Sequence, residues 1–225
     1  MEARSWYYTE DEADDLEELA MEASDSNLEV ALLKLKAFFD TTGLNYALQG
    51  GYAMRLQGFL ERKTYDLDVT TDARPPEIID ALKSNEENVN GEPIRYHEKV
   101  SQQLGVGGAV LYVDVSADTT RMFVHVDLLL AGDVLGARHI SSAEDKGGYK
   151  VLSISALFDN KLTSYNSRGA DKDYDDLVWM FNNKRDEIEN SVRDSSEEHR
   201  YRFLDRYAED NDDDGVTRLE EFLGL

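Results

Sequence analysis

The apolar positions of the chain are spaced for a mixture of helices and strands. Between residues 26 and 43 they recur every three to four positions, after a capping-box pair formed by Ser26 and Glu29, which predicts a helix. Alternating apolar and polar residues, or short valine-rich runs, predict strands. Further helices are predicted at 52–60, 75–83, 154–164 and 171–181, and strands at 45–49, 65–70, 109–115 and 122–130.

These elements predict an α/β (α+β) fold in which helices flank a mixed β-sheet. The last two strands are separated by a turn-like segment at 117–120 and should form an antiparallel hairpin. The expected division is an acidic N-terminal arm of residues 1–26, a core of residues 27–184, and an acidic helical C-terminal appendage of residues 185–225. The arm has only a thin apolar stripe, and we assign it no chemistry.

Acidic residues are concentrated at the two ends of the chain. The formal net charge is −23, from 24 basic and 47 acidic residues. Residues 1–30 carry −10 and residues 186–225 carry −9, which leaves −4 on the segment between them. An acidic surface repels nucleic-acid phosphates, so binding of duplex DNA is not expected, whereas a nucleotide or one RNA end can still reach a local basic site.

Several classes of site are excluded by composition. The chain has no cysteine, which excludes disulfides, thiolate zinc sites and a cysteine nucleophile. No apolar run approaches the roughly 20 residues that cross a bilayer, and the N-terminus lacks a signal-peptide pattern. We therefore expect a cytoplasmic protein without a membrane partner.

The densest chemical signal lies between Gly50 and Asp68. Gly50 and Gly51 stand where a predicted strand meets a helix, a turn that lets the backbone approach a phosphate group. Asp66 and Asp68 are two positions apart in the next strand, so their side chains leave the same face. Adjacent carboxylates repel each other, and a divalent cation between them relieves that repulsion. Two solvated aspartates on an edge strand are the alternative interpretation.

A third carboxylate is expected on a neighbouring strand, because magnesium in phosphoryl-transfer sites is commonly held by two or three acidic residues. Asp127 interrupts the strongly apolar segment 123–130, and Asp114 interrupts the segment 111–115. We favour Asp127 because its segment is the more apolar, and Asp114 is its rival.

The order of these residues resembles the nucleotidyltransferase superfamily, whose signature is a Gly-Gly or Gly-Ser turn followed by Asp-x-Asp on a strand. Within it, the segment from Arg62 through Thr64 to Asp68 is similar to the abortive-infection toxin branch, the AbiEii-like proteins. The later stretch 151–161, which ends at Lys161, and the segment 168–177 are similar to that branch as well. The resemblance covers roughly residues 28–182.

The resemblance implies a metal-dependent enzyme that transfers a nucleoside monophosphate from a nucleoside triphosphate to an acceptor hydroxyl and releases pyrophosphate. The implied catalytic residues are Asp66, Asp68 and Asp127, which would also bind Mg²⁺ or Mn²⁺. The implied nucleotide contacts are Gly50, Gly51, Arg62, Thr64 and Lys161. Without the resemblance, Lys161 is better explained as a surface lysine whose stem lies along apolar residues. Asp173 and Asp176 are expected to be structural and to pair with Arg62 or Arg168.

A second motif lies near the end of the chain. Residues 210–221 match the pattern D-x-D-x-D-G-x5-E of an EF-hand calcium loop and follow a helical lead-in at 198–209. Thr217 replaces the usual branched apolar residue of the loop, and an acidic tail without calcium is the alternative. The expected Ca²⁺ ligands are Asp210, Asp212, Asp214, Val216 and Glu221.

Two classes of function remain open from the sequence. The first is an active nucleotidyltransferase that acts on a nucleotide, a small molecule or an RNA end. The alternative is a non-catalytic or toxin-like nucleotide-binding or regulatory protein, calcium-responsive or not, or a reuse of the fold for another transfer reaction. The intact pair Asp66 and Asp68 favours the enzyme, because a cluster of acidic residues is costly to keep without a use.

Overall fold

The computed structural model describes residues 8–21, 23–84, 94–101, 106–116, 121–130 and 139–225. The chain forms two compact units, Met1–Val151 and Leu152–Leu225. The boundary expected at residue 184 is therefore displaced. The physical reason is that helices from both sides of residue 184 pack on α6 (Ile154–Arg168), so they belong to one helical unit.

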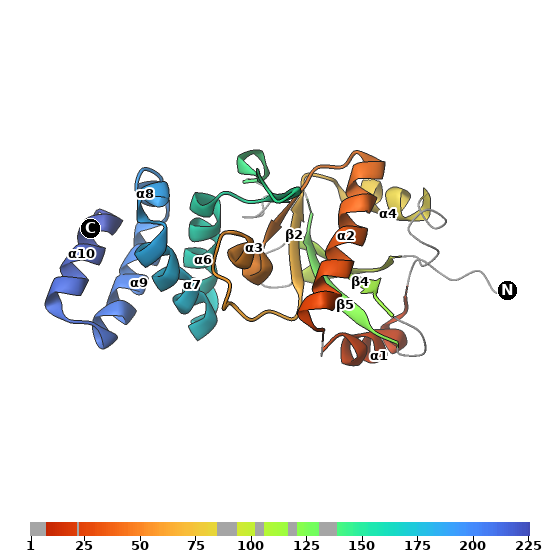
Figure 1. Cartoon of the computed structure of the whole chain (residues 1–225), viewed down its shortest axis with the longest axis horizontal. Helices are drawn as coiled ribbons and strands as arrows, with labels where there is room; N and C mark the ends of the chain where they lie inside the picture. Colours follow the sequence, from red (N-terminus) through yellow and green to blue (C-terminus); the bar gives the residue numbers. More distant parts are fainter. Residues whose placement is uncertain (1–7, 22, 85–93, 102–105, 117–120, 131–138) are drawn as a thin grey trace. The chain divides into compact units, whose positions relative to one another are not determined.

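The first unit is built on a seven-stranded mixed sheet (Figure 1), in the order β3-β4-β5-β2-β1-β7-β6. β2 pairs in parallel with β5 and antiparallel with β1, whereas β4 and β5 form the predicted antiparallel hairpin. The fold class predicted from the sequence is thus confirmed. The strands are β1 (Tyr46–Gln49), β2 (Leu67–Thr71), β3 (Arg95–Ser101), β4 (Val106–Asp114), β5 (Phe123–Leu129), β6 (Glu144–Lys146) and β7 (Tyr149–Val151).

One face of the sheet is covered by α2 (Asp25–Thr42), which runs alongside the strands (Figure 1). Phe39 of this helix stacks on Tyr46 of β1, with ring centroids 4.5 Å apart. The helix begins after Ser24, whose hydroxyl accepts a hydrogen bond from the Asn27 N–H, so the cap lies two residues before the predicted one. It ends at Gly43, in the left-handed conformation that favours glycine.

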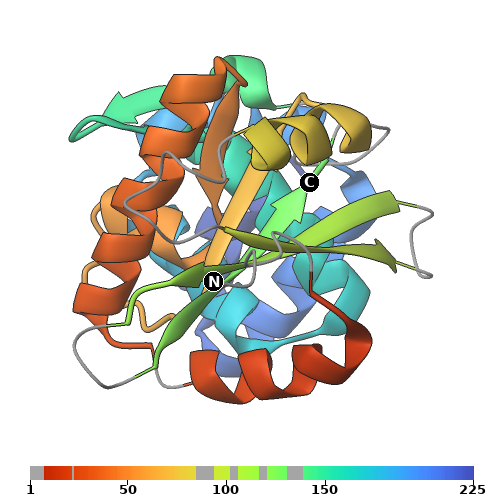
Figure 2. The ribbon, with the colours of Figure 1, turned by 90° about the vertical axis from the view of Figure 1, so that its right-hand side faces the viewer.

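The acidic N-terminal segment forms α1 (Glu10–Ala20), which packs on the opposite face of the sheet. In Figure 2, α1 lies below the strands and α4 (Pro75–Ser84) lies above them. Tyr8 and Leu16 join Tyr112 in an apolar cluster. Glu12 accepts hydrogen bonds from the Thr9 N–H at 3.0 Å and from Arg95 at 2.8 Å, and these two bonds lower the pKa of Glu12 to about 2. These contacts anchor the segment to the sheet.

The second unit is helical. It contains α6, α7 (Asp171–Asn183), α8 (Arg185–Ile188), α9 (Glu197–Asp210) and α10 (Asp213–Leu223). The aromatic rings of Phe158, Phe203 and Phe222 pack edge to face in its core. The helices predicted at 154–164 and 171–181 are confirmed, and Gly169 ends the first in a left-handed conformation.

Within the described ranges, no helix combines the length and apolarity needed to cross a bilayer.

The calcium loop predicted at residues 210–221 is not formed. α9 extends to Asp210, and α10 takes up the predicted loop from Asp213 onward. The Asp212 carboxylate accepts a hydrogen bond from the Gly215 N–H at 2.9 Å and so caps α10. An aspartate cap followed by acidic residues stabilises the start of a helix. Residues 210–221 therefore do not have the loop conformation predicted for an EF-hand, because the same acidic residues begin a helix, and calcium binding stays a prediction.

One predicted segment, the turn at 117–120, lies outside the described residues. Three strands, β3, β6 and β7, were not predicted. The sequence of β3 contains Glu98 and Lys99, charges that are common in edge strands and that weaken the apolar pattern.

Candidate active site

A row of residues crosses four neighbouring strands of the sheet. Gln49, Asp68, Asp127 and Val110 are successive pairing partners on β1, β2, β5 and β4. Side chains of residues paired in register leave the same face of a sheet. The structure therefore brings Asp68 and Asp127 side by side on adjacent parallel strands.

Asp114 lies elsewhere in the hairpin. Its pairing partner is Phe123, four residues along β5 from Asp127, which corresponds to roughly 13 Å of strand. The Asp114 carboxylate accepts a hydrogen bond from the Ser116 N–H at 2.8 Å, and its carbonyl accepts one from Lys34 Nζ at 2.6 Å. Of the two aspartates weighed from the sequence, Asp127 is the one in register with Asp68.

Gly50 is in close contact with Asp68. The glycine has φ +66°, and a β-carbon built on it would lie 1.8 Å from Oδ2 of Asp68 and 2.4 Å from its Cγ. No side chain of any size fits between them. The predicted glycine turn and the predicted carboxylate thus meet at one point, at the end of β1 where α3 (Gly50–Leu56) begins.

Gly51 is in contact with the segment that leads into β2. A β-carbon at Gly51 would lie 2.8 Å from Oγ1 of Thr64 and 3.6 Å from the guanidinium carbon of Arg62. The helix start is thus packed against a buried hydroxyl and a cationic group. The structure brings together four of the predicted residues, Gly50, Gly51, Arg62 and Thr64.

Asp66 is placed differently from Asp68. The predicted strand 65–70 begins only at Leu67, so Asp66 occupies the bend before β2 and has no pairing partner in the β2 ladders. Its Oδ1 accepts a hydrogen bond of 2.6 Å from the Thr64 hydroxyl. Thr64 therefore fixes the orientation of this half-buried carboxylate.

Two aromatic residues adjoin Asp127. His125 Nε2 lies 3.5 Å from Oδ1 of Asp127, and the His125 ring stacks on Tyr112 with centroids 5.4 Å apart. Burial raises the pKa of Tyr112 to about 12, and Glu17 and Asp127 add to the rise. Tyr112 was not singled out from the sequence, although alternation along the segment 109–115 places it on the face that Val110 shares.

The donor set of this site suits a hard divalent cation. Asp66, Asp68 and Asp127 provide only carboxylate oxygens, which are the ligands preferred by Mg²⁺ and Mn²⁺. Within the part of the chain that the structure describes, no three His, Cys, Asp or Glu side chains are already grouped as a metal site. Carboxylates repel one another, so a cation is what would draw such a group together.

Lys161 belongs to the second unit, where it is 6% exposed. Its ammonium group forms ion pairs with Asp173 at 3.1 Å and Asp176 at 2.6 Å. Arg168 donates two hydrogen bonds to Asp173, at 2.6 and 2.8 Å, which is one of the pairings expected from the sequence. The phosphate contact expected of Lys161 would require its ion pairs to open.

Neighbouring cations lower the pKa of Asp173 by more than burial raises it. Burial alone would raise the pKa of this carboxyl group, but the hydrogen bonds from Arg168 and the charge of Lys161 hold the pKa below its ordinary value. Asp173 is therefore an anion in the folded chain at neutral pH. The two cations and two anions form a neutral network between α6 and α7.

The fold is similar to that of several solved structures. A candidate nucleotidyltransferase from H. pylori aligns at 15% identity over 97% of this chain and 95% of its own, with a TM-score of 0.53. A nucleotidyltransferase-like antigenic protein from Paracoccidioides brasiliensis aligns at 16% identity over 70% and 77%, with a TM-score of 0.50. The antibiotic-resistance factor ANT(2'')-Ia aligns at 16% identity over 83% and 96%, with a TM-score of 0.50.

Sequence comparisons give the family. A search of curated proteins gave no match. The sequence model of the family described as "Nucleotidyl transferase AbiEii toxin, Type IV TA system" matches residues 32–222, which include the glycine turn, the three aspartates and most of the helical unit. The match extends further toward the C-terminus than the resemblance found at residues 28–182. The chain belongs to the AbiEii nucleotidyl transferase toxin family.

Proposed function

We propose that this chain transfers a nucleoside monophosphate from a nucleoside triphosphate to an acceptor hydroxyl. The observation that supports the proposal best is the register of Asp68 and Asp127 on adjacent parallel strands, next to Gly50. Two carboxylates held side by side at a glycine corner are suited to hold the divalent cations that stabilise the negative charge developing during phosphoryl transfer. Membership of a nucleotidyl transferase family supports the same reaction class.

The carboxylates Asp66, Asp68 and Asp127 would hold Mg²⁺ or Mn²⁺. When bound, the metal would neutralise phosphate charge and favour departure of pyrophosphate. The protein contributes positioning: Thr64 orients Asp66, and Gly50 leaves the space that Asp68 occupies. The Thr64 hydrogen bond and the space at Gly50 keep these two carboxylates in position before the substrate binds, which lowers the entropic cost of ordering the site.

The triphosphate is expected at the glycine corner. Gly50 and Gly51 present backbone without side chains, and the Arg62 guanidinium, next to Gly51, supplies the positive charge that a polyphosphate requires. The Thr64 hydroxyl already donates to Asp66, so we assign Thr64 to orienting the carboxylate as well as to the nucleotide. Lys161 takes part in phosphate binding only if its ion pairs with Asp173 and Asp176 open.

The acceptor hydroxyl would approach on the Asp127 side. In-line attack on the α-phosphorus requires the hydroxyl to lose its proton, and Asp127 is the carboxylate we assign to orient the hydroxyl and receive that proton. His125, 3.5 Å away, is placed to interact with the same carboxylate. The formal charge of −23 argues for a nucleotide, a small molecule or one RNA end as acceptor, and against duplex DNA.

A transfer assay tests the proposal. The full chain is incubated with each nucleoside triphosphate labelled at the α-phosphate, Mg²⁺ or Mn²⁺, and acceptors drawn from RNA ends, nucleotides and small molecules. Labelled acceptor and an equal amount of pyrophosphate are expected from the unaltered chain and not from Asp68→Asn or Asp127→Asn. Asp114→Asn is the matched control and should retain transfer.

Binding measurements separate the enzyme from a non-catalytic nucleotide-binding protein. Metal-dependent triphosphate binding without any labelled product or pyrophosphate would support the second class. Triphosphate binding that is unchanged in the double variant Asp66→Asn/Asp68→Asn would overturn the assignment of the site.

A further inference from the structure

A nitrogen atom beside the candidate active site has no hydrogen-bond partner among the described residues. It is Nε2 of His125, which is buried although 25% of the side chain is exposed. A buried polar atom without a partner is unfavourable, and such atoms are rare in folded proteins. The position of this nitrogen therefore indicates a partner that it meets when the site is in use.

The neighbour that can serve as this partner is Asp127. His125 and Asp127 are two positions apart in β5, so their side chains leave the same face of the sheet. Nε2 lies 3.5 Å from Oδ1 of Asp127, just beyond the roughly 2.7–3.2 Å of an ordinary N–H···O hydrogen bond. The Asp127 side chain is 45% exposed, so its carboxylate has room to turn. A small rotation of the carboxylate brings Oδ1 into hydrogen-bonding range.

The imidazole is held from its other side by stacking. Tyr112 pairs with His125 across β4 and β5, and the two rings stack with centroids 5.4 Å apart and an interplanar angle of 19°. Tyr8, just before α1, packs edge to face on Tyr112 with centroids 5.2 Å apart. Both tyrosines are almost fully buried. The three rings, which we name the aromatic stack, therefore restrict the rotation of His125.

The outer end of the aromatic stack belongs to a part of the chain that the family model does not match. That model begins at residue 32, and both Tyr8 and α1 precede it. α1 is fixed to the sheet by Leu16 and by the ion pair of Glu12 with Arg95 at 2.8 Å. The N-terminal segment thus buries the far side of the stack and has a structural link to the candidate active site.

We propose that His125 is a positioning residue for Asp127 and that the aromatic stack holds its imidazole in place. In the tautomer that carries hydrogen on Nε2, His125 would donate to Oδ1 of Asp127 and leave Oδ2 for the divalent cation. Carboxylates that bind metal ions are commonly held by such outer hydrogen bonds. This inference rests on the proposed function, because it requires Asp127 to bind the cation.

Binding of Mn²⁺ to the full chain without substrate, measured by electron paramagnetic resonance, tests the proposal. His125→Phe keeps a ring for the stack but removes the donor, and it should weaken Mn²⁺ binding by about tenfold. His125→Gln keeps an N–H donor at a similar reach and should recover a large part of that loss. His139→Phe is the matched control and should leave Mn²⁺ binding unchanged.

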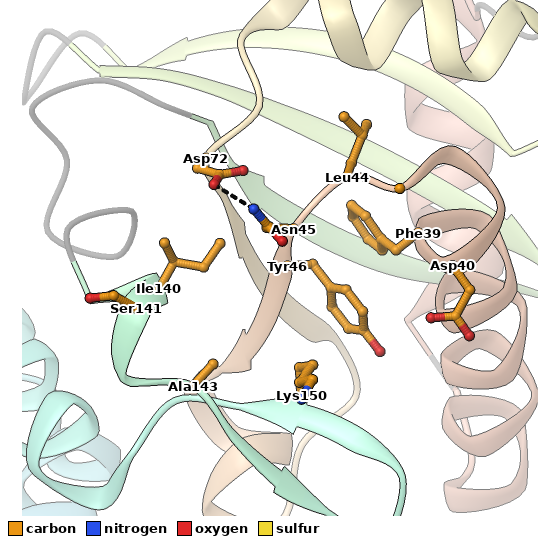
Figure 3. A pocket seen from close by; sticks show the side chains of 11 residues that line it. Phe39, Asp40, Leu44, Asn45, Tyr46, Asp72, Ile140, Ser141, Ala143 and Lys150 are labelled. Atoms are coloured by element: carbon orange, nitrogen blue, oxygen red, sulfur yellow. Dashed lines mark hydrogen bonds between the residues drawn. The ribbon is translucent and has the colours of Figure 1, made fainter.

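His139 is a suitable control because it lies away from the candidate site. It directly precedes Ile140 and Ser141, which line a cavity at the start of β1 together with Asn45 (Figure 3). Asp68, in contrast, pairs with the last residue of β1. The control thus makes the same substitution at the other end of the strand.

Two variants of Tyr112 test the role of the stack. Tyr112→Leu removes the ring against which His125 packs, and it should weaken Mn²⁺ binding, though less than His125→Phe does. Tyr112→Phe keeps the ring and should bind Mn²⁺ more tightly than Tyr112→Leu. Circular dichroism and urea denaturation check that each variant folds. Equal weakening in the two variants would overturn the role of the stack.

Transfer kinetics give a second readout that a general loss of structure would not produce. In His125→Phe, the Mn²⁺ concentration that gives half-maximal transfer should rise by the same factor as the dissociation constant. The rate at saturating Mn²⁺ should fall much less, because excess metal compensates for a poorly oriented ligand. A fall in the saturating rate without any change in the Mn²⁺ requirement would contradict the positioning role.

Three binding results would overturn the proposal. The first is Mn²⁺ binding by His125→Phe that equals that of the unaltered chain. The second is an equal loss in His125→Gln and His125→Phe, because the donor would then not matter. The third is the absence of Mn²⁺ binding to the unaltered chain, which would remove the cation that Asp127 is assigned to hold. Intact Mn²⁺ binding without nucleotidyl transfer would contradict the proposed function alone, and the binding series would still decide the role of His125.

Discussion

Oδ2 of Asp68 lies 1.8 Å from the position that a β-carbon on Gly50 would take, so the glycine and the carboxylate share one space. Gly50 also has φ +66°, a conformation that costs an L-residue about 1–2 kcal/mol. The turn between β1 and α3 therefore excludes a side chain for two reasons. One is backbone conformation, and the other is the position of the candidate catalytic group.

Gly50→Ala should lower the free energy of unfolding by about 2–4 kcal/mol and abolish transfer, because alanine adds strain and displaces Asp68. Gly147→Ala is the control, since Gly147 has φ +65° but nothing within 4 Å of a β-carbon. It should cost about 1 kcal/mol and leave transfer unchanged. Urea denaturation and the labelled-phosphate assay measure both variants. Full transfer activity in Gly50→Ala would contradict the assignment.

Asp127→Asn should reduce transfer by about 100-fold or more, because asparagine keeps the shape of aspartate but removes its charge and its ability to accept a proton. Asp114→Asn should stay within about twofold of the unaltered chain. Initial rates at saturating triphosphate check both. If Asp114→Asn were the inactive variant, the third carboxylate would have to be reassigned.

Lys161→Met should lower the free energy of unfolding by about 3–5 kcal/mol, because it removes one cation from a buried ion network. Adding Asp176→Asn should restore part of that loss, since it removes a charge that Lys161 had balanced. Lys172→Met, at an exposed position of α7, is the control and should have little effect. Denaturation of all variants in urea gives the comparison. A loss of transfer with no loss of stability in Lys161→Met would instead favour direct phosphate contact.

The lowered pKa of Asp173 predicts a dependence of stability on pH. The unfolded carboxyl group binds a proton near its ordinary pKa of 3.8, and the folded one binds it only at lower pH. The stabilisation is therefore present above pH 3.8 and is lost as the pH falls through the lowered folded value. The difference in unfolding free energy between the unaltered chain and Asp173→Asn should shrink in that window. A difference that grows with acidification would contradict the sign.

Asp212→Ala should lower the free energy of unfolding by about 1 kcal/mol, because it removes the side-chain cap of α10. Asp213→Ala, at the next and exposed position, is the control. Calcium at millimolar concentration should leave the unfolding midpoint of the unaltered chain unchanged. A rise in that midpoint with calcium, absent in Asp212→Ala, would support the prediction that residues 210–221 bind calcium.

Much of the fold followed from local patterns. The helices α2, α4, α6 and α7 and the β4–β5 hairpin were predicted near their observed positions, since each has a clear apolar period or a turn signal. The strands β6 and β7 have three residues each, too short to show a period. The anchoring of α1 was missed because it depends on Tyr8, Leu16 and a pairing with Arg95, which is distant in the chain.

The sequence by itself determined the glycine turn, the strand position of Asp68 and the family resemblance, because these depend on local properties of the chain. Asp66, in contrast, lies in the bend before β2 and not on the predicted strand. Only the tertiary structure decided that Asp127, and not Asp114, stands in register with Asp68, since pairing between distant strands depends on how the whole sheet packs. It also decided that residues after Asp212 form a helix and not an ion-binding loop. The acidic pattern allows both structures, and helix capping with burial of Leu219 and Phe222 selects the helix.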